Sequence, residues 1–503
     1  MKTNKLLAFV LGFIFFSTSC SDDFLEVKTT SRLTSEAAVA TMEADPAKLE
    51  GFVNAIYSMM VQYDLVYTNH DAFGYMSILH STEMMSEDIV QVKATHFTYD
   101  YILDNRGDTY RRTRVNWTYL YSIVSSANIV LNLTSAESTS PEIKAYRGQV
   151  LALRGMAYYY LIQLYQQNYG IVGAATDLPG VPLYFATNEG KPNRLNRVPV
   201  KEVYAQIESD LTTAVVNLNG WSRGNKNQVN YYVANGILAR FYLLSEQWAK
   251  AASAALEAQK GGTIMSAAKI HDGFMDIANS EWLWGFDHSA ETETRYASFF
   301  SHISNITPGY AGLEYGARLI DKRLYESIPA TDERKKLFQG ATQIYDATSL
   351  GSSSMASTTA TGWKLPYASL KFGWNGNWTM DYPYMRTAEM VLIEAEALVR
   401  QNKGSEAATA LKKLLANRDP AWNQSSVTVD EIWMQRRIEL WGEGFAYFDL
   451  KRLNKGIDRT YSGTNHRTDA QKKFSAGTKD WIYRLPQTEI LENSEIDEAD
   501  NNE

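Results

Sequence analysis

Aromatic side chains mixed with amides and carboxylates form the strongest chemical signal in this sequence. Residues 95–105 (THFTYDYILDN) alternate aromatic and polar side chains, and residues 363–378 place three tryptophans in a stretch rich in Gly and Asn. Aromatic rings offer broad apolar faces to sugar rings, while Asn and Asp satisfy hydroxyl groups, so such mixtures suit recognition of carbohydrate or peptide. The alternative is that the rings pack loops onto a scaffold, as buried aromatics commonly do. The candidate ligand contacts are Tyr99, Tyr101, Asn105, Tyr296, Trp363, Trp374 and Trp378.

Clustered carboxylates raise the possibility of glycoside hydrolysis, which needs two of them. Asp287, Glu291 and Glu293 lie close together, and three glutamates lie within residues 389–396. An acidic chain of this length offers many such pairs, so the pattern alone does not identify an enzyme. A glycosidase with a helical fold therefore stays open as an alternative.

Signatures of metal, nucleotide and nucleophile chemistry are missing from the sequence. There is no HExxH, no GxxxxGK[ST], no GxGxxG after a strand and no GxSxG, and one cysteine cannot build a Cys-rich zinc site. The histidines lack close ligand spacing and are interpreted as surface or packed residues: His70, His80, His96, His271, His288, His302 and His466. The sequence predicts no cofactor and leaves only a structural Ca²⁺ open.

The densest charge cluster lies in RRIELWGEGFAYFDLKR, residues 436–452. On a helix, Arg436 could reach Glu439, and Glu439 would share a face with Glu443. One interpretation is an acid/base or anion site. We favour partly buried ion pairs that tie the last helix to the scaffold, with Glu394 or Glu396 as further partners, because paired buried charges commonly fix packing.

Helical periodicity runs through most of the chain and must position these groups. Apolar and small residues keep helical spacing near 117–133, over 145–165, after Pro199, over 231–244 and 248–259, and as a pair near 385–417 with Gly404 in its turn. Helical hairpins with this spacing are similar to degenerate tetratricopeptide repeats, which bury their faces only by stacking. We therefore expect a mainly α scaffold.

Three segments break the helical pattern. SEWLWGF, residues 280–286, alternates like a short strand, and residues 340–380 form a long irregular excursion rich in Gly, Ser and Thr. The acidic residues 496–503 are expected to fray. The predicted architecture is thus a helical scaffold that carries loop-rich insertions and little β structure.

Overall charge excludes one class of partner. Forty-nine Lys and Arg against fifty-seven Asp and Glu give a net charge of −8, so the 503-residue chain has no basic balance with which to neutralise phosphates. Nucleic acid is therefore not expected as a partner. No segment after the N-terminus approaches 18 uninterrupted apolar residues, so no second membrane crossing is expected.

The first residues are typical of an export signal. Lys2 and Lys5 precede an apolar run over 6–16 that is too short to span a bilayer, which predicts a signal peptide over residues 1–19. Small residues lead into Cys20, the only cysteine, so cleavage before Cys20 and acylation of it would make a lipid anchor. Ser17 stands where the best-known lipobox has Leu, and an ordinary secretory signal is the alternative.

Motifs spread over nearly the whole chain resemble those of the RagB/SusD family, the outer-membrane nutrient-binding lipoproteins of Bacteroidetes. The matching stretches are CSDDFL (20–25), VLALRGMAYYYLIQLY (150–165), LPGVPLY (178–184), YPYMRTAEMVLIEAEAL (382–398), RRIELWGEGFAYFDLKR (436–452) and YRLPQTEI (483–490). Ala446 stands where the family usually has Arg, so local ion pairing there is not transferred.

The resemblance implies a single SusD-like domain over residues 20–503, with the helical scaffold mainly over 45–260 and 382–455 and a loop-rich insertion at about 265–381. It implies a cell-surface lipoprotein of the outer membrane that captures oligosaccharide without catalysis and delivers it, as a lid, to a SusC-like TonB-dependent transporter. A peptide-capturing member of the family and a docking lipoprotein without a small ligand are the alternatives. The family's ligand residues lie on variable loops, so no site residue is transferred.

Overall fold

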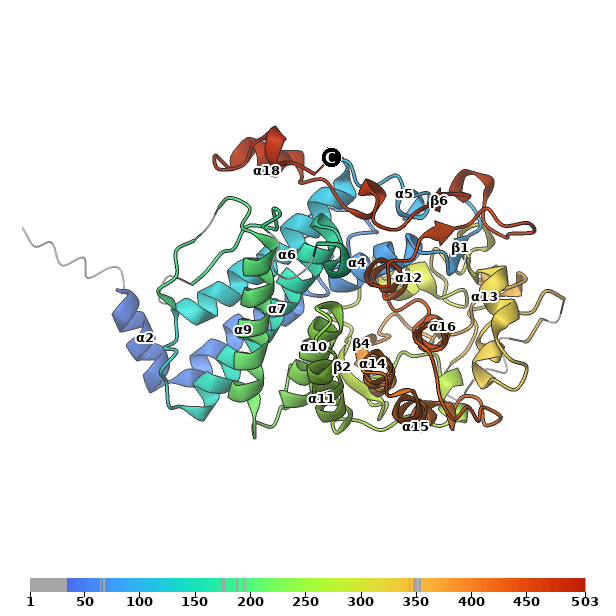
Figure 1. Cartoon of the computed structure of the whole chain (residues 1–503), viewed down its shortest axis with the longest axis horizontal. Coiled ribbons are helices and arrows are strands. Elements are labelled where there is room, and N and C mark those ends of the chain that lie inside the picture. Colours follow the sequence, from blue (N-terminus) through green and yellow to red (C-terminus); the bar gives the residue numbers. More distant parts are fainter. Residues whose placement is uncertain are drawn as a thin grey trace, which may run out of the picture.

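Helices dominate the structure, and many of the irregular segments lie in the half opposite the N-terminal helix (Figure 1). The computed structural model describes residues 34–502 except 64, 67, 173–176, 187–188, 194, 343, 347–350 and 352–353, so the expected signal peptide and Cys20 lie outside the described residues. The helices are α2 (Ser35–Ala44), α3 (Glu50–Met59), α4 (Tyr75–Met84), α5 (Thr98–Tyr101), α6 (Arg111–Asn132), α7 (Pro141–Tyr165), α8 (Tyr169–Val172), α9 (Val200–Leu218), α10 (Tyr231–Leu244), α11 (Trp248–Gln259), α12 (Phe299–Ile303), α13 (Lys322–Ser327), α14 (Thr387–Arg400), α15 (Gly404–Leu415), α16 (Val429–Glu439), α17 (Ala446–Arg452) and α18 (Gln487–Glu492). The expected mainly α fold is confirmed.

The long helices form a continuous stack in which each one packs on the next. α6 packs against α7, α7 against α9, α9 against α10, α10 against α11, α11 against α14, and α14 against α15. Figure 1 shows the chain returning to the stack at α14 after a long excursion. α10 and α11 begin and end at the expected residues, because their small residues and turn are read from local sequence alone. In the described part of the chain, no helix combines the length and apolar character needed to cross a bilayer.

Glycine and an ion pair support the close packing of α7 on α9. A Cβ at Gly155 would lie 2.9 Å from Leu211 Cδ2 of α9, so a larger residue there would push this leucine side chain aside. The adjacent Arg154 is buried and donates from Nε and Nη2 to the Asp210 carboxylate at 2.8 Å each, and from Nη1 to Asn128 of α6 at 2.7 Å. Burial opposes the charge on Arg154, but Asp210 outweighs burial and raises the pKa of the guanidinium. The pair therefore fixes the register of three helices.

Short antiparallel strand pairs connect the irregular segments to the stack. β1 (Ile89–Gln91) pairs with β3 (Arg318–Ile320), β2 (Trp282–Phe286) with β4 (Tyr382–Arg386), and β5 (Ile457–Asp458) with β6 (Lys473–Phe474). The strand expected at 280–286 is β2, and its partner β4 runs directly into α14. The pairing thus anchors the loop-rich insertion to the helical scaffold.

The C-terminal segment is held against the scaffold, so the expectation that residues 496–503 fray is wrong for its described part. Ile496 is buried, and Asn502 donates from Nδ2 to the carbonyls of Tyr165 and Tyr483 at 2.8 and 2.7 Å. Arg197 donates to the Asp500 carbonyl at 2.6 Å. Two of these contacts join residues that are 337 and 303 positions apart in sequence, so composition alone could not reveal them.

Candidate functional site

A cavity of about 850 Å³ opens where residues 95–112 meet the segment after α3 and the segment between α12 and β3. Three separate stretches of chain contribute its wall, and β1–β3 pairing brings two of them together. The lining residues are Asp71, Thr95, His96, Phe97, Thr98, Tyr99, Asp100, Asn105, Thr109, Tyr110, Arg111, Arg112 and Tyr310. Aromatic, hydroxyl and charged groups therefore converge on one hollow, which is the usual character of a small-ligand site.

A single helical turn, α5, presents Tyr99 at the mouth of this cavity. The Thr95 amide donates to Thr98 Oγ1 at 2.8 Å, and Gln91 of β1 donates from Nε2 to Thr95 Oγ1 at 2.7 Å, which fixes the entry into the turn. Because a helix turns about 100° per residue, side chains two positions apart point to nearly opposite sides. Tyr99 is accordingly 63% exposed, whereas Tyr101 is buried.

Aromatic rings continue from the cavity wall across the neighbouring surface in an arrangement that we term the aromatic array: Trp374, Trp378, Tyr296, Tyr310 and His96. Successive ring centroids lie 5.2, 5.6, 5.8 and 4.6 Å apart in that order. Tyr296 is 48% exposed, Trp374 is buried, and the other three are half-buried. Edge-to-face and tilted contacts at these distances support each ring, so their free faces are held in place.

Histidines form the base of the array. His70 and the Tyr310 hydroxyl share a hydrogen bond of 2.7 Å, and His302 Nε2 donates to the His70 carbonyl at 2.8 Å. Burial lowers the pKa of His96, and burial holds the pKa of His302 well below its usual range. These two rings are therefore neutral near pH 7 and present no charge to a ligand.

Four of the residues proposed from sequence lie in or beside this site. Tyr99 lines the cavity, and Tyr296, Trp374 and Trp378 belong to the aromatic array. They come from three separate stretches of the sequence, so their convergence arises from the fold.

The other three residues proposed from sequence are placed differently. Tyr101 has no exposed surface, and its hydroxyl is bonded to His466 Nδ1 at 2.8 Å. Asn105 lines the cavity but is buried, where it donates to Asp100 at 2.6 Å and supports the wall. Trp363 is half-buried and donates from Nε1 to the Ala360 carbonyl at 3.1 Å. In the described residues, no ring of the aromatic array packs against Trp363.

Several site residues carried no usable sequence signal. His70, His96, Tyr310 and Arg111 come from segments far apart in the chain, and the histidines were interpreted as isolated residues. The only local hint was that His96 belongs to the aromatic segment at 95–105. Spacing rules detect ligands within one helix or loop, so a site assembled from three separate segments escapes them.

Charged groups at the cavity wall are paired with one another. Arg112 donates from Nε to Asp100 Oδ1 at 3.0 Å and lies 3.6 Å from Asp71 Oδ2, while Arg111 is hydrogen-bonded to Asp71 Oδ2. Arg112 also lies 4.9 Å from the centre of the Phe97 ring. Burial raises the pKa of Asp100, whereas Asp100 and Asp71 outweigh burial and raise the pKa of Arg112. The wall is thus polar without a net charge.

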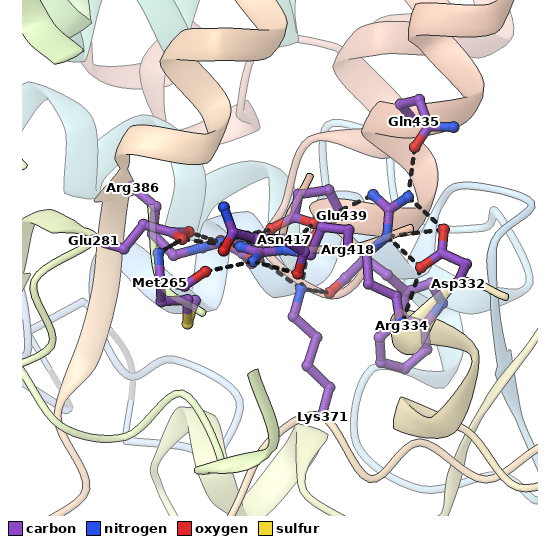
Figure 2. A network of polar contacts seen from close by, with 12 residues as sticks. Met265, Glu281, Asp332, Arg334, Lys371, Arg386, Asn417, Arg418, Gln435 and Glu439 are labelled. Atoms are coloured by element: carbon purple, nitrogen blue, oxygen red, sulfur yellow. Dashed lines mark hydrogen bonds and ion pairs between the residues drawn. The ribbon is translucent and has the colours of Figure 1, made fainter. Parts of the chain in front are cut away.

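A second cluster of charges is structural, and we term it the buried network (Figure 2). Arg386 of β4 bonds to Glu281 and Glu439, and its Nη2 lies 2.6 Å from Glu443 Oε1. The network contains four cations and four carboxylates, all buried: Arg334, Lys371, Arg386, Arg418, Glu281, Asp332, Glu439 and Glu443.

The pKa directions of two carboxylates in the network agree with ionised pairs, although burial lowers the pKa of the Lys371 ammonium. Burial opposes ionisation of Glu439, but Arg418, Arg386 and Arg334 outweigh it and hold the pKa of that carboxyl well below its usual range. Glu443 behaves in the same way beside Arg386 and Lys371, which lower the pKa of its carboxyl despite burial. The expectation that this motif forms buried ion pairs is confirmed.

The partners within the motif differ from those expected. Arg436 does not reach Glu439; it donates from Nε to Asp449 Oδ2 at 2.7 Å, and Arg437 bonds to Glu87 and Asp88. Glu439 faces the buried network instead, because α16 turns that side of the helix toward β4 and the segment after α15.

Three of the carboxylates considered for hydrolysis lie on α14, and each of them is paired with a cation. Glu389 accepts from Arg240 at 2.6 Å, Glu394 from Lys413 at 2.8 Å, and Glu396 from Arg452 at 2.7 Å. Each carboxylate has a different cation as its partner, so the three do not share a reactive space. Within the described ranges, no group of three His, Cys, Asp or Glu side chains could hold a metal ion.

Comparison with known proteins agrees with this architecture. A family profile described as "Starch-binding associating with outer membrane" matches residues 23–243, and a profile described as "SusD family" matches residues 254–501. The SusD-like protein P2 of Formosa agariphila is 24% identical over 427 residues, which cover 78% of this chain and 80% of that protein.

Solved structures show the same fold. A SusD-like carbohydrate binding protein from Bacteroides vulgatus is similar with a TM-score of 0.76 and 25% identity, covering 91% of this chain and 98% of that chain. Surface glycan-binding protein A from Bacteroides thetaiotaomicron, solved in complex with laminarihexaose, has a TM-score of 0.66 and 16% identity, covering 91% and 99%. Together the two profiles cover nearly the whole chain, and the solved structures share its fold. The protein belongs to the SusD/RagB family.

Proposed function

We propose that the protein captures an oligosaccharide across the aromatic array and the adjoining cavity, without catalysis, and passes it to a SusC-like TonB-dependent transporter. The mature chain, residues 20–503, acts in this proposal as one unit anchored to the outer membrane through lipidated Cys20 and facing the cell exterior. It closes over the transporter as a lid.

One observation carries the proposal: supported aromatic rings lie beside a hollow of about 850 Å³ that also offers hydroxyl and carboxylate groups. A sugar ring has an apolar face that stacks on an aromatic ring and a rim of hydroxyls that need hydrogen-bond partners. Tyr296 and Tyr99, the two most exposed rings here, are positioned to begin such stacking. Paired carboxylates and arginines at the wall suit the hydroxyls.

Relatives support the glycan rather than the peptide alternative. Solved proteins with this fold include one described as a SusD-like carbohydrate binding protein, one in complex with laminarihexaose and one described as a laminarin binding SusD-like protein. A family profile for association with the outer membrane covers the N-terminal half, which supports the proposed location. The lipid anchor, the transporter and the lid motion follow from family membership alone in this proposal.

The test is calorimetric titration of the soluble chain, beginning after Cys20, against a panel of soluble glycans and mixed peptides. Replacing Trp378 by alanine is expected to weaken glycan binding by about 5- to 150-fold, the loss typical of one stacked ring. Tyr296→Ala should lose a similar amount. Phe52→Ala serves as the matched control, because Phe52 is an exposed ring on α3 outside the cavity lining.

Each outcome is decisive for the proposal. Glycan binding that drops in the Trp378 and Tyr296 variants, with intact ligand recovered afterwards, supports capture without catalysis. If only peptides release heat on titration, the ligand is a peptide and not a glycan. Shortened glycan after incubation would overturn the non-catalytic assignment. Equal losses in all three variants would mean that the array is not the binding surface.

A further inference from the structure

The charge pattern of the cavity points to a particular class of sugar. The charged side chains among its described lining residues are Asp71, Asp100, Arg111 and Arg112, two anions and two cations. His96, which also lines the cavity, is neutral near pH 7 because burial lowers its pKa. The wall therefore has no excess positive charge with which to attract an anionic ligand.

Each cation is neutralised by a carboxylate at hydrogen-bond distance. Arg112 uses Nε and Nη2 on the two oxygens of Asp100, at 3.0 and 3.3 Å, and its Nη1 donates to the Asp71 carbonyl at 3.2 Å. Arg111 donates from Nη2 to Asp71 Oδ2. Beside Tyr296, Arg295 is likewise paired with Glu293 at 3.1 Å.

One carboxylate oxygen of the wall has no hydrogen-bond donor in the protein. Asp71 Oδ1 is buried without a protein partner, whereas Oδ2 of the same carboxylate carries the bond to Arg111. The negative charge of this carboxylate disfavours a uronate or a sulfate at the wall, whereas a neutral sugar carries no charge for it to repel. The net charge of −8 on the whole chain adds a repulsive long-range field for anionic chains.

We infer that the cavity selects uncharged oligosaccharides over those that carry uronate or sulfate groups, and that Asp71 sets this selectivity by neutralising Arg111. The inference rests on the proposed function. A negative group placed at the wall would lose its hydration and find only cations that are already neutralised. A neutral sugar loses less on desolvation and keeps its hydroxyl contacts. Asp71 is thus a specificity-determining residue.

The experiment compares matched pairs of oligosaccharides of equal length: gluco-oligosaccharide with oligoglucuronate, manno-oligosaccharide with oligomannuronate, and galacto-oligosaccharide with oligogalacturonate. Dissociation constants are measured calorimetrically for the soluble chain at low and high salt. In the pair that binds, the neutral member is expected to bind at least about tenfold more tightly, and the gap should shrink as salt rises. An acidic member that binds as tightly or more tightly overturns the inference.

Substitution of Asp71 tests the assigned residue. Asp71→Asn keeps the size of the side chain and releases the charge of Arg111, so affinity for the acidic member should rise about fivefold or more while the neutral member changes little. Arg111→Gln should leave discrimination intact. Asp45→Asn is the matched control, because Asp45 is paired with Lys48 at 3.1 Å on the exposed surface away from the cavity.

The outcomes separate this inference from the proposed function. An unchanged acidic-to-neutral ratio in the Asp71→Asn protein, with folding verified by circular dichroism, removes Asp71 from the role. Binding of glycans with no discrimination between pair members overturns the selectivity but leaves glycan capture standing. If no member of any pair binds, both the selectivity inference and the proposed glycan capture are overturned, since the inference needs a glycan at this site.

Discussion

Replacing Arg386 by methionine removes the cation at the centre of the buried network. Its guanidinium bonds to the carboxylates of Glu281, Glu439 and Glu443 and to the Glu439 carbonyl, and its side chain has no exposed surface. Methionine has similar length and fills the space without charge. The network would then contain three cations and four carboxylates, so one buried negative charge would lack compensation.

The size of the effect follows from that uncompensated charge. Breaking a buried ion pair on one side costs about 3–5 kcal/mol, a large part of the roughly 5–15 kcal/mol by which domains are stable. The bonds are not additive, because Glu439 keeps Arg418 and Arg334, and Glu443 keeps Lys371. We therefore expect a loss of about 4 kcal/mol in the free energy of unfolding at pH 7.5.

The loss should shrink in acid. In the native protein Arg386 and Lys371 outweigh burial and lower the pKa of Glu443, so this carboxylate stabilises the fold above its unfolded pKa. Without Arg386, burial raises the pKa of the same carboxyl instead. It can then take up a proton in the folded state, and part of the lost stability returns as pH falls toward 5.

Urea unfolding followed by circular dichroism at pH 7.5 and 5.5 measures both effects. Arg295→Met is the matched control, because Arg295 pairs with Glu293 on the exposed surface and should change stability by less than about 0.5 kcal/mol. The double variant Arg386→Met with Glu443→Gln restores charge balance and should be more stable than the single variant. A single-variant loss below about 1 kcal/mol, or a double variant that is worse, would refute the reasoning.

Three further predictions address other parts of the fold. Burial lowers the pKa of His288 to about 4, so as pH falls below 6.5 the unfolded chain binds this proton before the folded chain does. His288→Asn should therefore reduce the stability difference between pH 7 and pH 5, measured by urea unfolding, by about 2 kcal/mol. Equal differences in the variant and the unmodified protein would contradict the assignment. Gly444 has φ of +91°, and a Cβ there would lie 2.5 Å from Leu79 Cβ. Gly444→Ala should lower the free energy of unfolding by about 2 kcal/mol or more. Gly51→Ala, in an open helical position, should be neutral or stabilising in the same assay. Asn502→Ala leaves two buried carbonyls without their donor and should lower the free energy of unfolding by about 1–3 kcal/mol. A lower urea midpoint and faster proteolysis of the C-terminal segment would show this loss. An unchanged midpoint would show that the segment does not contribute to stability.

The helical stack was predictable because its signals are local. α10 and α11 carry their small residues and their turn within thirty or so residues of sequence, and the Arg–Glu motif at 436–452 could be interpreted as buried ion pairs from its density alone. The identity of the partners was not predictable. Arg436 pairs with Asp449, while Glu439 takes cations from three distant segments, and those choices depend on which face of α16 packs inward.

The candidate site, too, could be predicted from the sequence only in part. Alternation in residues 95–105 favoured Tyr99 and Tyr101 together, but the segment folds into the turn of α5 and sends the two rings to opposite sides. The tryptophan-rich segment carried a signal in the sequence, yet only the fold places Trp378 against Tyr296. Tyr310, His70 and His302 had no local pattern.

The buried network also constrains the order in which this chain can fold. Glu281 meets Arg386 and Arg418 from 105 and 137 positions away, whereas α10 and α11 are neighbours in sequence. Early, local contacts can therefore assemble the N-terminal hairpins, but any intermediate that has gathered only some of the network buries unmatched charge and is unstable. The C-terminal half must close in one late, cooperative step, after its whole sequence is present. We therefore expect that a chain that ends before Glu443 has no stable partly folded intermediate.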